Sequence, residues 1–268
     1  MIIAASRLSI AGIRARLGVG LTSRQLFLFQ EVESTNATLG RLARSGVPEG
    51  TVVLAEAQTG GRGRLGQPWF SPPGVNLYAS VLLRERLTLD EVPVFSFVAG
   101  LALADAVESA GASPTIKWPN DVLIDGRKMG GARIECSARD AEVEHVIIGV
   151  GANLNVGLDD LAVALGPKAE ATSLRAATGH EIDRNVFTAD YLNALDTWVR
   201  CYRKGGPAPV FQAWRERDIL TGRQVEIHDA GGAFVGRVAG VDRHGRLLVR
   251  DAVGESRTVT TEEIRPCD

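Results

Sequence analysis

The chain of 268 residues is poor in the residues that build disulfide frameworks and metal centres. It has 3 cysteines, Cys136, Cys201 and Cys267, and they do not show the spacing of a metal-ligand motif. Its 4 histidines are scattered, with no pair one helical turn apart. An odd and widely spaced set of cysteines argues against a disulfide scaffold and for a reducing compartment.

Strong net charge and long apolar runs are also lacking. The net charge of −2 and the pI near 6.1 give no broad basic field that would gather nucleic acid or an anionic membrane. The apolar run at the N-terminus is interrupted by Arg7 and is too short for a signal peptide. No apolar run approaches the roughly 20 residues of a membrane-spanning helix. With 45% hydrophobic and 23% charged residues, we expect a soluble and cytoplasmic protein without membrane contact.

Hydrophobic periodicity divides the chain into a short lead-in (1–24), a large domain of helices and strands (25–220) and a small C-terminal domain (221–268). A helix is expected after the N-cap sequence Ser34-Thr35-Asn36, and the clearest amphipathic helix runs from Tyr191 to Tyr202. The other expected elements are a loop with a helical turn at 156–180, a helix at 97–107, and strands at 26–32, 51–57, 76–83 (half-buried), 115–118, 133–136 and 146–150.

The C-terminal domain is predicted to consist of strands alone, beginning near residues 220–222. Four or five short alternating strands in about 50 residues are typical of a small SH3-like β-barrel. These strands are expected at 224–228, 233–241, 246–250 and 256–260, with glycine-containing turns between them.

Glycine and arginine, by contrast, are concentrated in one loop. Residues Gly60 to Gly66 read GGRGRLG and directly follow an apolar strand. Glycine lets the backbone approach a ligand closely, and successive N–H groups in such a loop bind anions. Arg62 and Arg64 add bidentate recognition of phosphate or carboxylate. An anionic ligand is therefore the favoured interpretation. A flexible hairpin tip and a nucleic-acid contact of the RGG type are the alternatives.

Three further segments join this loop as candidate site residues. They are Ser34-Thr35-Asn36, Lys117-Trp118-Pro119-Asn120-Asp121 and Lys128-Met129-Gly130-Gly131. Each taken alone has a simpler interpretation, because Ser34 can cap a helix, Lys117 can reach the surface from a strand, and Asn120-Asp121 can form a turn. Their combination with Gln58 and the glycine–arginine loop is what indicates a site.

In combination and order these segments resemble the biotin protein ligases. The resemblance runs from about Leu28 to the C-terminus and is most specific in the Gly-Arg-Gly-Arg loop and in Lys117-Trp118-Pro119-Asn120-Asp121. It implies an α/β (α+β) fold, with a class II synthetase-like catalytic domain of the biotin–lipoate ligase type, a mixed sheet and the SH3-like barrel. The resemblance also rests on six other segments, which are Glu33–Asn36, Ala55–Gln58, Trp69–Pro72, Asn76–Tyr78, Gly149–Asn155 and Gly240–Asp242.

The resemblance implies that biotin and ATP condense to biotinyl-5′-adenylate, and that biotin then passes to a lysine of a biotin carboxyl carrier domain. Lys117 would bridge the biotin carboxylate and the α-phosphate. Arg62 and Arg64 would hold the anionic groups and shield the adenylate. Mg²⁺ is expected as a counter-ion held mainly by the phosphates. The other ligand-binding residues implied are Ser34, Thr35, Asn36 and Gln58 at the biotin head group, and Gly61, Gly63, Trp69, Asn120, Gly131 and Asn153.

The chain also departs from the family pattern. Leu65 and Gln67 stand where some members carry further arginines, and Arg133 stands where an aliphatic residue is usual. Residues 156–165 include no tryptophan that would stack on adenine. The stretch before the first expected strand is shorter than the winged helix-turn-helix of members that repress transcription. We therefore expect no DNA binding, and a monomer or weak homodimer. The alternatives are a lipoyl or octanoyl transferase and, from another class, a biotin-sensing DNA-binding regulator.

Overall fold

The computed structural model describes residues 7–140, 142–229, 232–251, 253–260 and 263–267. The lead-in is short, with helix α1 (Ile10–Arg14) and the 3-10 turn η1 (Leu21–Ser23). Both pack against helix α6 (Arg184–Gly205). The first described segment is therefore part of the large domain's surface rather than a separate unit.

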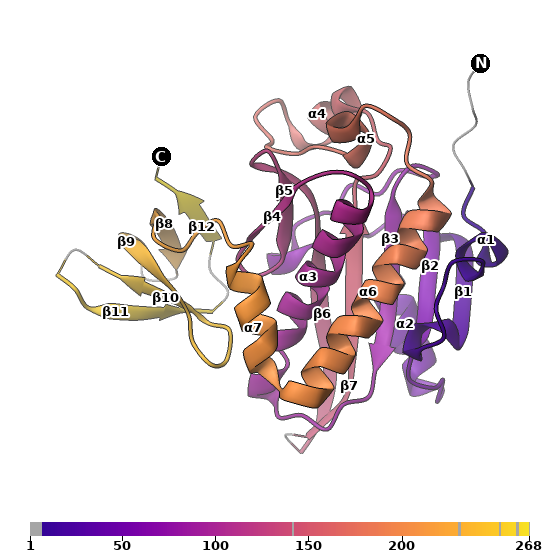
Figure 1. Ribbon diagram of the computed structural model, residues 1–268, viewed down its shortest axis with the longest axis horizontal. Helices are drawn as coiled ribbons and strands as arrows, with labels where there is room; N and C mark the ends of the chain where they lie inside the picture. The colour runs from indigo at the N-terminus through magenta and orange to yellow at the C-terminus, as the bar shows by residue number, and fades with distance from the viewer. Residues whose placement is uncertain (1–6, 141, 230–231, 252, 261–262, 268) are drawn as a thin grey trace.

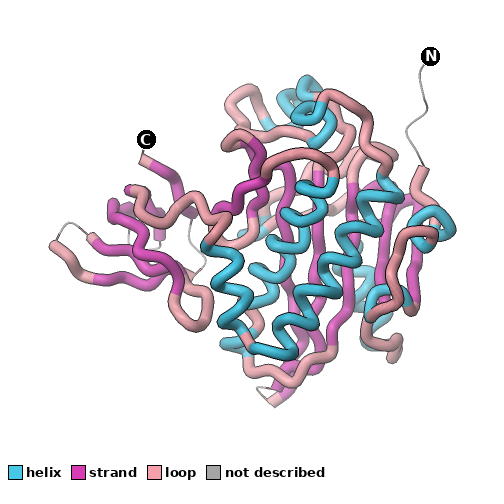
Figure 2. The backbone as a smooth tube through the Cα atoms, in the orientation of Figure 1, coloured by secondary structure: helices cyan, strands magenta, loops and turns pink. Residues whose placement is uncertain are grey.

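The centre of the molecule is a seven-stranded mixed sheet (Figures 1 and 2). Strands β1 and β2 are parallel, and every other neighbouring pair is antiparallel. The expected mixed sheet is therefore confirmed. In spatial order the strands are β1 (Gln25–Val32), β2 (Thr51–Gln58), β3 (Leu77–Leu83), β7 (Glu142–Ala152), β6 (Arg127–Arg139), β5 (Asp121–Ile124) and β4 (Pro114–Lys117).

Helices cover both faces of this sheet. Helices α3 (Val94–Ser109), α6 and α7 (Pro207–Arg215) form one layer, seen in front of the sheet in Figure 1, and α2 (Thr35–Arg44) packs on the other face. Strand β3 is consequently buried along its whole length. The expectation of a half-buried strand at 76–83 is wrong, because the alternate side chains Ser80 and Leu82 face α2 rather than solvent.

Helix α3 is the most apolar helix of the chain. The segment Leu89–Ser109, which includes the 3-10 turn η3 (Leu89–Glu91), has the length and composition of a membrane-spanning helix, contrary to the expectation that no such run exists. In the structure 67% of its apolar window is buried, because α3 packs against α6, α7 and the sheet. Its hydrophobicity is that of a core helix.

Several elements differ from the sequence prediction. The loop expected at 156–180 contains two helices, α4 (Leu158–Leu165) and α5 (Leu174–Thr178). The strand expected at 133–136 is the middle of the much longer β6, and strand β5 was not expected. Helix α7 was also missed, although Pro207 at its first turn is a helix-start signal. Short elements between polar turns carry too little periodicity to be recognised.

The C-terminal domain is a five-stranded antiparallel sheet. Its strands are confirmed at the expected places, with one more at the end of the chain. Strands β11 and β12 stand at opposite edges and do not pair with each other, so the described residues form an open sheet and do not close into a barrel. In spatial order the strands are β11 (Ser256–Val259), β10 (Leu247–Arg250), β9 (Gly232–Val241), β8 (Gln224–Asp229) and β12 (Glu263–Pro266).

The two sheets meet at the end of β4. Trp118 Nε1 donates a hydrogen bond of 2.8 Å to the Gly245 carbonyl oxygen in the turn between β9 and β10. Phe97 of α3 packs at the same junction, against Phe211 and Trp214 of α7. The C-terminal domain is thereby fastened to the segment that carries Lys117 and Asp121.

Candidate active site

The glycine–arginine loop is a hairpin that projects from the end of β2. The Gly63 N–H donates to the Gln67 carbonyl at 2.7 Å, and the Trp69 N–H donates to the Gly61 carbonyl at 3.0 Å. A 3-10 turn, η2 (Arg64–Gly66), forms the tip. The loop therefore has internal hydrogen bonds that fix its shape.

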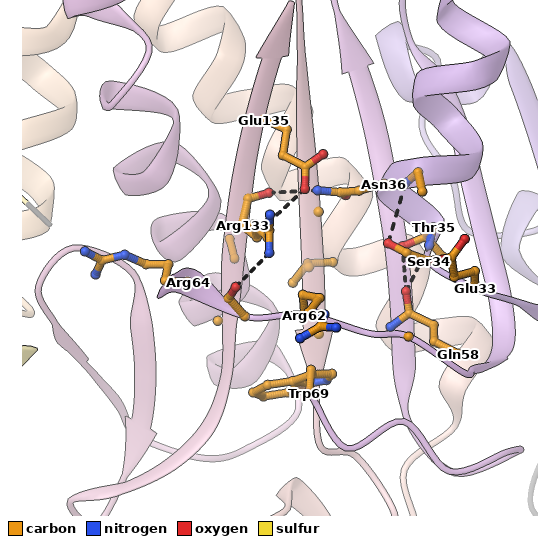
Figure 3. Close-up of a pocket in the computed structure, with 18 of the residues that line it drawn as sticks. Glu33, Ser34, Thr35, Asn36, Gln58, Arg62, Arg64, Trp69, Arg133 and Glu135 are labelled. Carbon is orange, nitrogen blue, oxygen red and sulfur yellow. Dashed lines mark hydrogen bonds and ion pairs between the residues drawn. The ribbon is translucent and has the colours of Figure 1, made fainter. Parts of the chain in front are cut away.

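A first cavity of about 220 Å³ lies between this loop, the N-terminus of α2, the middle of β6 and the end of β7 (Figure 3). It brings together all four residues predicted for the biotin head group. Its lining includes Ser34, Thr35, Asn36, Gln58, Arg62, Gly63, Arg64, Trp69, Gly131, Arg133, Glu135, Gly149 and Gly151.

A network of neutral polar groups forms one wall of the first cavity. Gln58 Oε1 accepts from the Thr35 N–H at 2.9 Å, and Gln58 Nε2 donates to Ser71 Oγ at 3.1 Å. Ser80 Oγ lies 2.8 Å from Thr35 Oγ1 and 2.6 Å from Asn36 Oδ1. Ser34 caps α2, accepting from the backbone at 3.5 Å. Amides and hydroxyls held in this way can recognise a neutral polar ligand without burying a charge.

A second cavity of about 450 Å³ adjoins the first on the other side of the loop. Its lining is more apolar and includes Phe70, Leu161, Leu165 and Ile264, together with Lys117. The apolar side chains come from α4 and from the C-terminal domain as well as from the loop. The two cavities share Gly63, Arg64, Trp69, Asp121 and Lys128.

Lys128 stands at the junction between the two cavities. Its Nζ lies 2.7 Å from Asp121 Oδ1 and 5.6 Å from the centroid of the Trp69 ring. Lys117 lines the second cavity only. The bridging role predicted for Lys117 therefore fits the position of Lys128 better, because only Lys128 reaches both spaces.

The two predicted loop arginines point in different directions (Figure 3). Arg62 lies beside Trp69, and its Nη1 donates to the Gly66 carbonyl at 3.0 Å. The Arg64 guanidinium extends to the other side of the loop and lies over the Trp118 ring, 5.1 Å from its centroid. A cation stacked on an aromatic face is held in place at the edge of both cavities.

Two glycines of β7 make room for the walls of the first cavity. A Cβ at Gly149 would lie 2.1 Å from Asn36 Oδ1, and a Cβ at Gly151 would lie 2.4 Å from Trp69 Nε1. Any larger residue would displace those side chains. The resemblance had matched this glycine motif without assigning it a role, and the structure shows the close approach that requires it.

Two predicted residues lie outside the two cavities. Gly61 and Asn120 do not line either cavity. Gly61 is buried against Ser71 and Gln58, where a Cβ would come within 2.7 Å of Ser71 Oγ. Asn120 is 1% exposed and donates to the Ala132 carbonyl behind β6.

Asn153 lines the second cavity but is already engaged in hydrogen bonds. Its Nδ2 donates to the Thr172 carbonyl at 3.1 Å, and its Oδ1 lies 3.5 Å from Asn76 Nδ2. In this structure Asn153 therefore positions the neighbouring backbone.

The sequence analysis included Asp121 and Lys128 in its candidate segments without giving either a role, and both line the two cavities. It missed Arg133 and Glu135 as cavity residues. Arg133 and Glu135 could have been found from strand alternation, since Gly131, Arg133 and Glu135 are two residues apart and point to one face of β6.

The fold therefore carries two joined cavities, one with a wall of neutral amides and hydroxyls and one that combines cations with apolar surface. The Biotin/lipoate A/B protein ligase family matches residues 28–153, and the Biotin protein ligase C terminal domain matches residues 220–264. The chain belongs to the biotin protein ligase family.

Individual relatives agree with this assignment. The biotin–[acetyl-CoA-carboxylase] ligase of Paracoccus denitrificans is 34% identical over 230 residues, covering 85% of this chain and 95% of the relative. The bifunctional ligase/repressor BirA of Bacillus spizizenii is 34% identical over 249 residues, covering 92% of this chain and 76% of the relative. A similar solved structure is the biotin protein ligase from Aquifex aeolicus in complex with biotin and ATP. Its TM-score is 0.74 at 27% identity, covering 91% of this chain and 99% of that chain.

Proposed function

We propose that this protein is an ATP-dependent biotin protein ligase that forms biotinyl-5′-AMP and transfers biotin to a lysine of a biotin carboxyl carrier domain. The observation that carries the proposal is the pair of cavities joined at Lys128. The first has one wall of neutral amides and hydroxyls beside the charged side chains of the loop and β6, and the second has cations and apolar surface. The similar A. aeolicus ligase was solved with biotin and ATP, which are the two ligands that such cavities would receive.

The first cavity suits the ureido head of biotin. A urea offers one acceptor oxygen and two N–H donors and carries no charge, so it requires polar partners rather than ions. Ser34, Thr35, Asn36 and Gln58 supply both kinds of partner from α2 and β2. The biotin carboxylate would then lie toward the junction, beside Lys128.

The first reaction forms one bond and breaks another at the α-phosphorus. A biotin carboxylate oxygen attacks the α-phosphorus of ATP, the bond to the β-phosphate oxygen breaks, and pyrophosphate leaves with that electron pair. Negative charge accumulates between the two cavities as this happens. The Lys128 ammonium would stabilise it, and Arg64, which lines both cavities, would hold the phosphates with Arg62, which lines the first.

The second reaction passes the acyl group to the carrier. The neutral amine of the acceptor lysine attacks the carbonyl carbon of the adenylate, AMP leaves with the bonding electrons, and the amine loses a proton to solvent. Lys117, on β4 in the second cavity, would remain with the AMP phosphate. We propose the carrier domain as the macromolecular partner.

Mg²⁺ is proposed as a companion of ATP rather than as a resident ion of the protein. Among the described residues there is no group of three or more His, Cys, Asp and Glu side chains that could hold a metal ion. Two of the three carboxylates that line the cavities, Asp121 and Glu135, are paired with cations, and the third is Glu33. Such a donor set fits an ion carried by the triphosphate, whose charge the ion neutralises.

Biotin-dependent exchange of labelled pyrophosphate into ATP tests the proposal. The purified protein should catalyse exchange with biotin, and octanoate or lipoate should support much less, because an alkyl carboxylate cannot replace the ureido contacts of the first cavity. Equal exchange with lipoate or octanoate would contradict the biotin selectivity proposed for the first cavity. No exchange with any of the three acids would overturn the proposed first step.

Two further expectations concern structure and assembly. The class II synthetase-like and SH3-like relationships remain proposals based on the family resemblance. The monomer or weak homodimer is also a proposal, and sedimentation of the purified protein over a range of concentrations would test it. A tight dimer at nanomolar concentration would contradict it.

A further inference from the structure

The wall of the first cavity contains an ion pair that the family resemblance does not predict. Arg133 lies in the middle of β6, opposite Gly149 of β7, at a position where an aliphatic residue is usual. Its side chain faces the cavity and not the core, as Figure 3 shows. A guanidinium at this place therefore requires an explanation.

Arg133 connects the sheet to the glycine–arginine loop. Its Nη1 donates to the Gly63 carbonyl oxygen at 3.0 Å, and its Nε lies 2.8 Å from Glu135 Oε1 (Figure 3). Glu135 is two residues along the same strand, so the ion pair holds the guanidinium in one orientation. The planar fork of arginine allows it to serve both partners at once.

The contact reaches the loop at a glycine beside its tip. Gly63 lies between the two loop arginines, next to the 3-10 turn at the tip. Glycine-rich backbone has many alternative conformations, so an added tether lowers the population of open ones. Strand β6 is paired along its length with β7, which makes it a rigid support for such a tether.

We propose that Arg133 is a latch that holds the glycine–arginine loop over the first cavity before any ligand binds. Arg133 is thus a positioning residue, because it acts through the Gly63 backbone. An aliphatic side chain at this position would leave the loop to be ordered by the ligand itself. The latch removes part of that ordering cost from the binding step.

A consequence for catalysis rests on the proposed function. If the cavity holds biotinyl-5′-AMP, a latched loop slows its escape before the carrier arrives. The variant without the latch should then release the adenylate faster. Retention of the adenylate is a property of the enzyme with its ligand bound. The latch is a property of the ligand-free protein and can be tested without the adenylate.

Limited trypsin digestion of the ligand-free protein tests the latch directly. The bonds after Arg62 and Arg64 are loop bonds, and Arg62 is exposed, so cleavage there reports how often the loop opens. Arg133→Leu should raise the cleavage rate at these bonds about three- to tenfold, which is the range for loss of one partly exposed charge-assisted hydrogen bond.

The matched control is Arg139→Leu. Arg139 is also on β6 and is also paired with a glutamate, Glu144, at 3.2 Å. This variant should leave the cleavage rate at the loop unchanged. Arg133→Lys keeps the charge but lacks the fork, so its rate should lie between wild type and Arg133→Leu. If Arg133→Leu does not fold, the cleavage rate of Arg133→Lys is compared with that of wild type instead.

The outcomes separate the latch from the proposed activity. Equal cleavage rates for wild type, Arg133→Leu and Arg133→Lys would overturn the latch, whatever the enzyme does. Faster cleavage with no adenylate formed by the wild type would support the latch and contradict the proposed function. Faster cleavage in Arg133→Leu and Arg139→Leu alike would mean general loosening of the sheet and would also overturn the latch.

Discussion

Replacing Lys128 with alanine should slow adenylate formation far more than replacing Lys117. Lys128 Nζ is held 2.7 Å from Asp121 Oδ1 at the junction of the cavities, and its side chain is 37% exposed. Two unit charges 4 Å apart interact by about 4 kcal/mol at an effective dielectric of 20, and partial exposure lowers this toward about 3 kcal/mol. That corresponds to about a 10²-fold loss of rate, similar to the removal of one preorganised donor in other enzymes.

The measurement is biotin-dependent release of pyrophosphate under saturating ATP and biotin. Lys128→Ala should reduce kcat about 10²-fold or more. Lys117→Ala should act mainly on the KM for ATP, because Lys117 lines the second cavity alone. A larger kcat loss for Lys117→Ala than for Lys128→Ala would refute the geometric reasoning and favour the assignment predicted from the sequence.

One control removes an ambiguity in this comparison. Lys128→Ala also leaves the Asp121 carboxylate without its ion-pair partner, where it would repel the biotin carboxylate. The double variant Lys128→Ala/Asp121→Asn removes that repulsion. It should remain slow if Lys128 acts on the reacting groups. Recovery of most of the rate would show that the single variant merely exposed a carboxylate.

Three other predictions concern stability and partners. Tyr191→Phe should raise the free energy of unfolding by about 1 kcal/mol, since the fully buried Tyr191 hydroxyl has no hydrogen-bond partner among the described residues. Tyr78→Phe should lower it by about 1 kcal/mol, because that hydroxyl donates to the Pro72 carbonyl at 2.9 Å. Urea denaturation of both variants measures the difference, and shifts of the same sign would contradict the reasoning. Burial, aided by the charge of Arg84, lowers the pKa of His145 below 6.5. The unfolded chain therefore takes up this proton first as the pH falls, so stability is lost below about pH 6.5. His145→Gln should lose less stability than wild type between pH 7 and pH 5, and equal losses would contradict this. Finally, the chain of 268 residues should give no sequence-dependent gel shift with biotin-operon DNA, with or without biotin and ATP. A saturable shift at physiological salt would overturn that expectation.

Much of the large domain could be predicted from local patterns. The helix at Ser34 was predictable because an N-cap serine precedes an apolar stripe, and the structure has α2 beginning at Thr35. The burial of β3 was not predictable in the same way. Its alternation resembles a half-exposed strand, and only the packing of α2 on the second face makes it fully buried.

The site was predicted in its parts rather than in its geometry. The loop and the segments around Lys117 and Lys128 were recognisable as motifs. Which lysine reaches both cavities depends on the pairing of β4, β5 and β6, and a sequence without structure does not determine that. Asn120 lies within a specific motif, yet its side chain is buried, donates to the Ala132 carbonyl and lines neither cavity.

The central claim is that this protein joins biotin to a lysine of a carrier domain. Intact-mass spectrometry of a purified biotin carboxyl carrier domain, incubated with the protein, biotin, ATP and Mg²⁺, tests it most directly. The account predicts one added biotin per carrier, lost when ATP is omitted or when the acceptor lysine is replaced by arginine. An unmodified carrier, in a preparation that binds biotin and ATP, would contradict it.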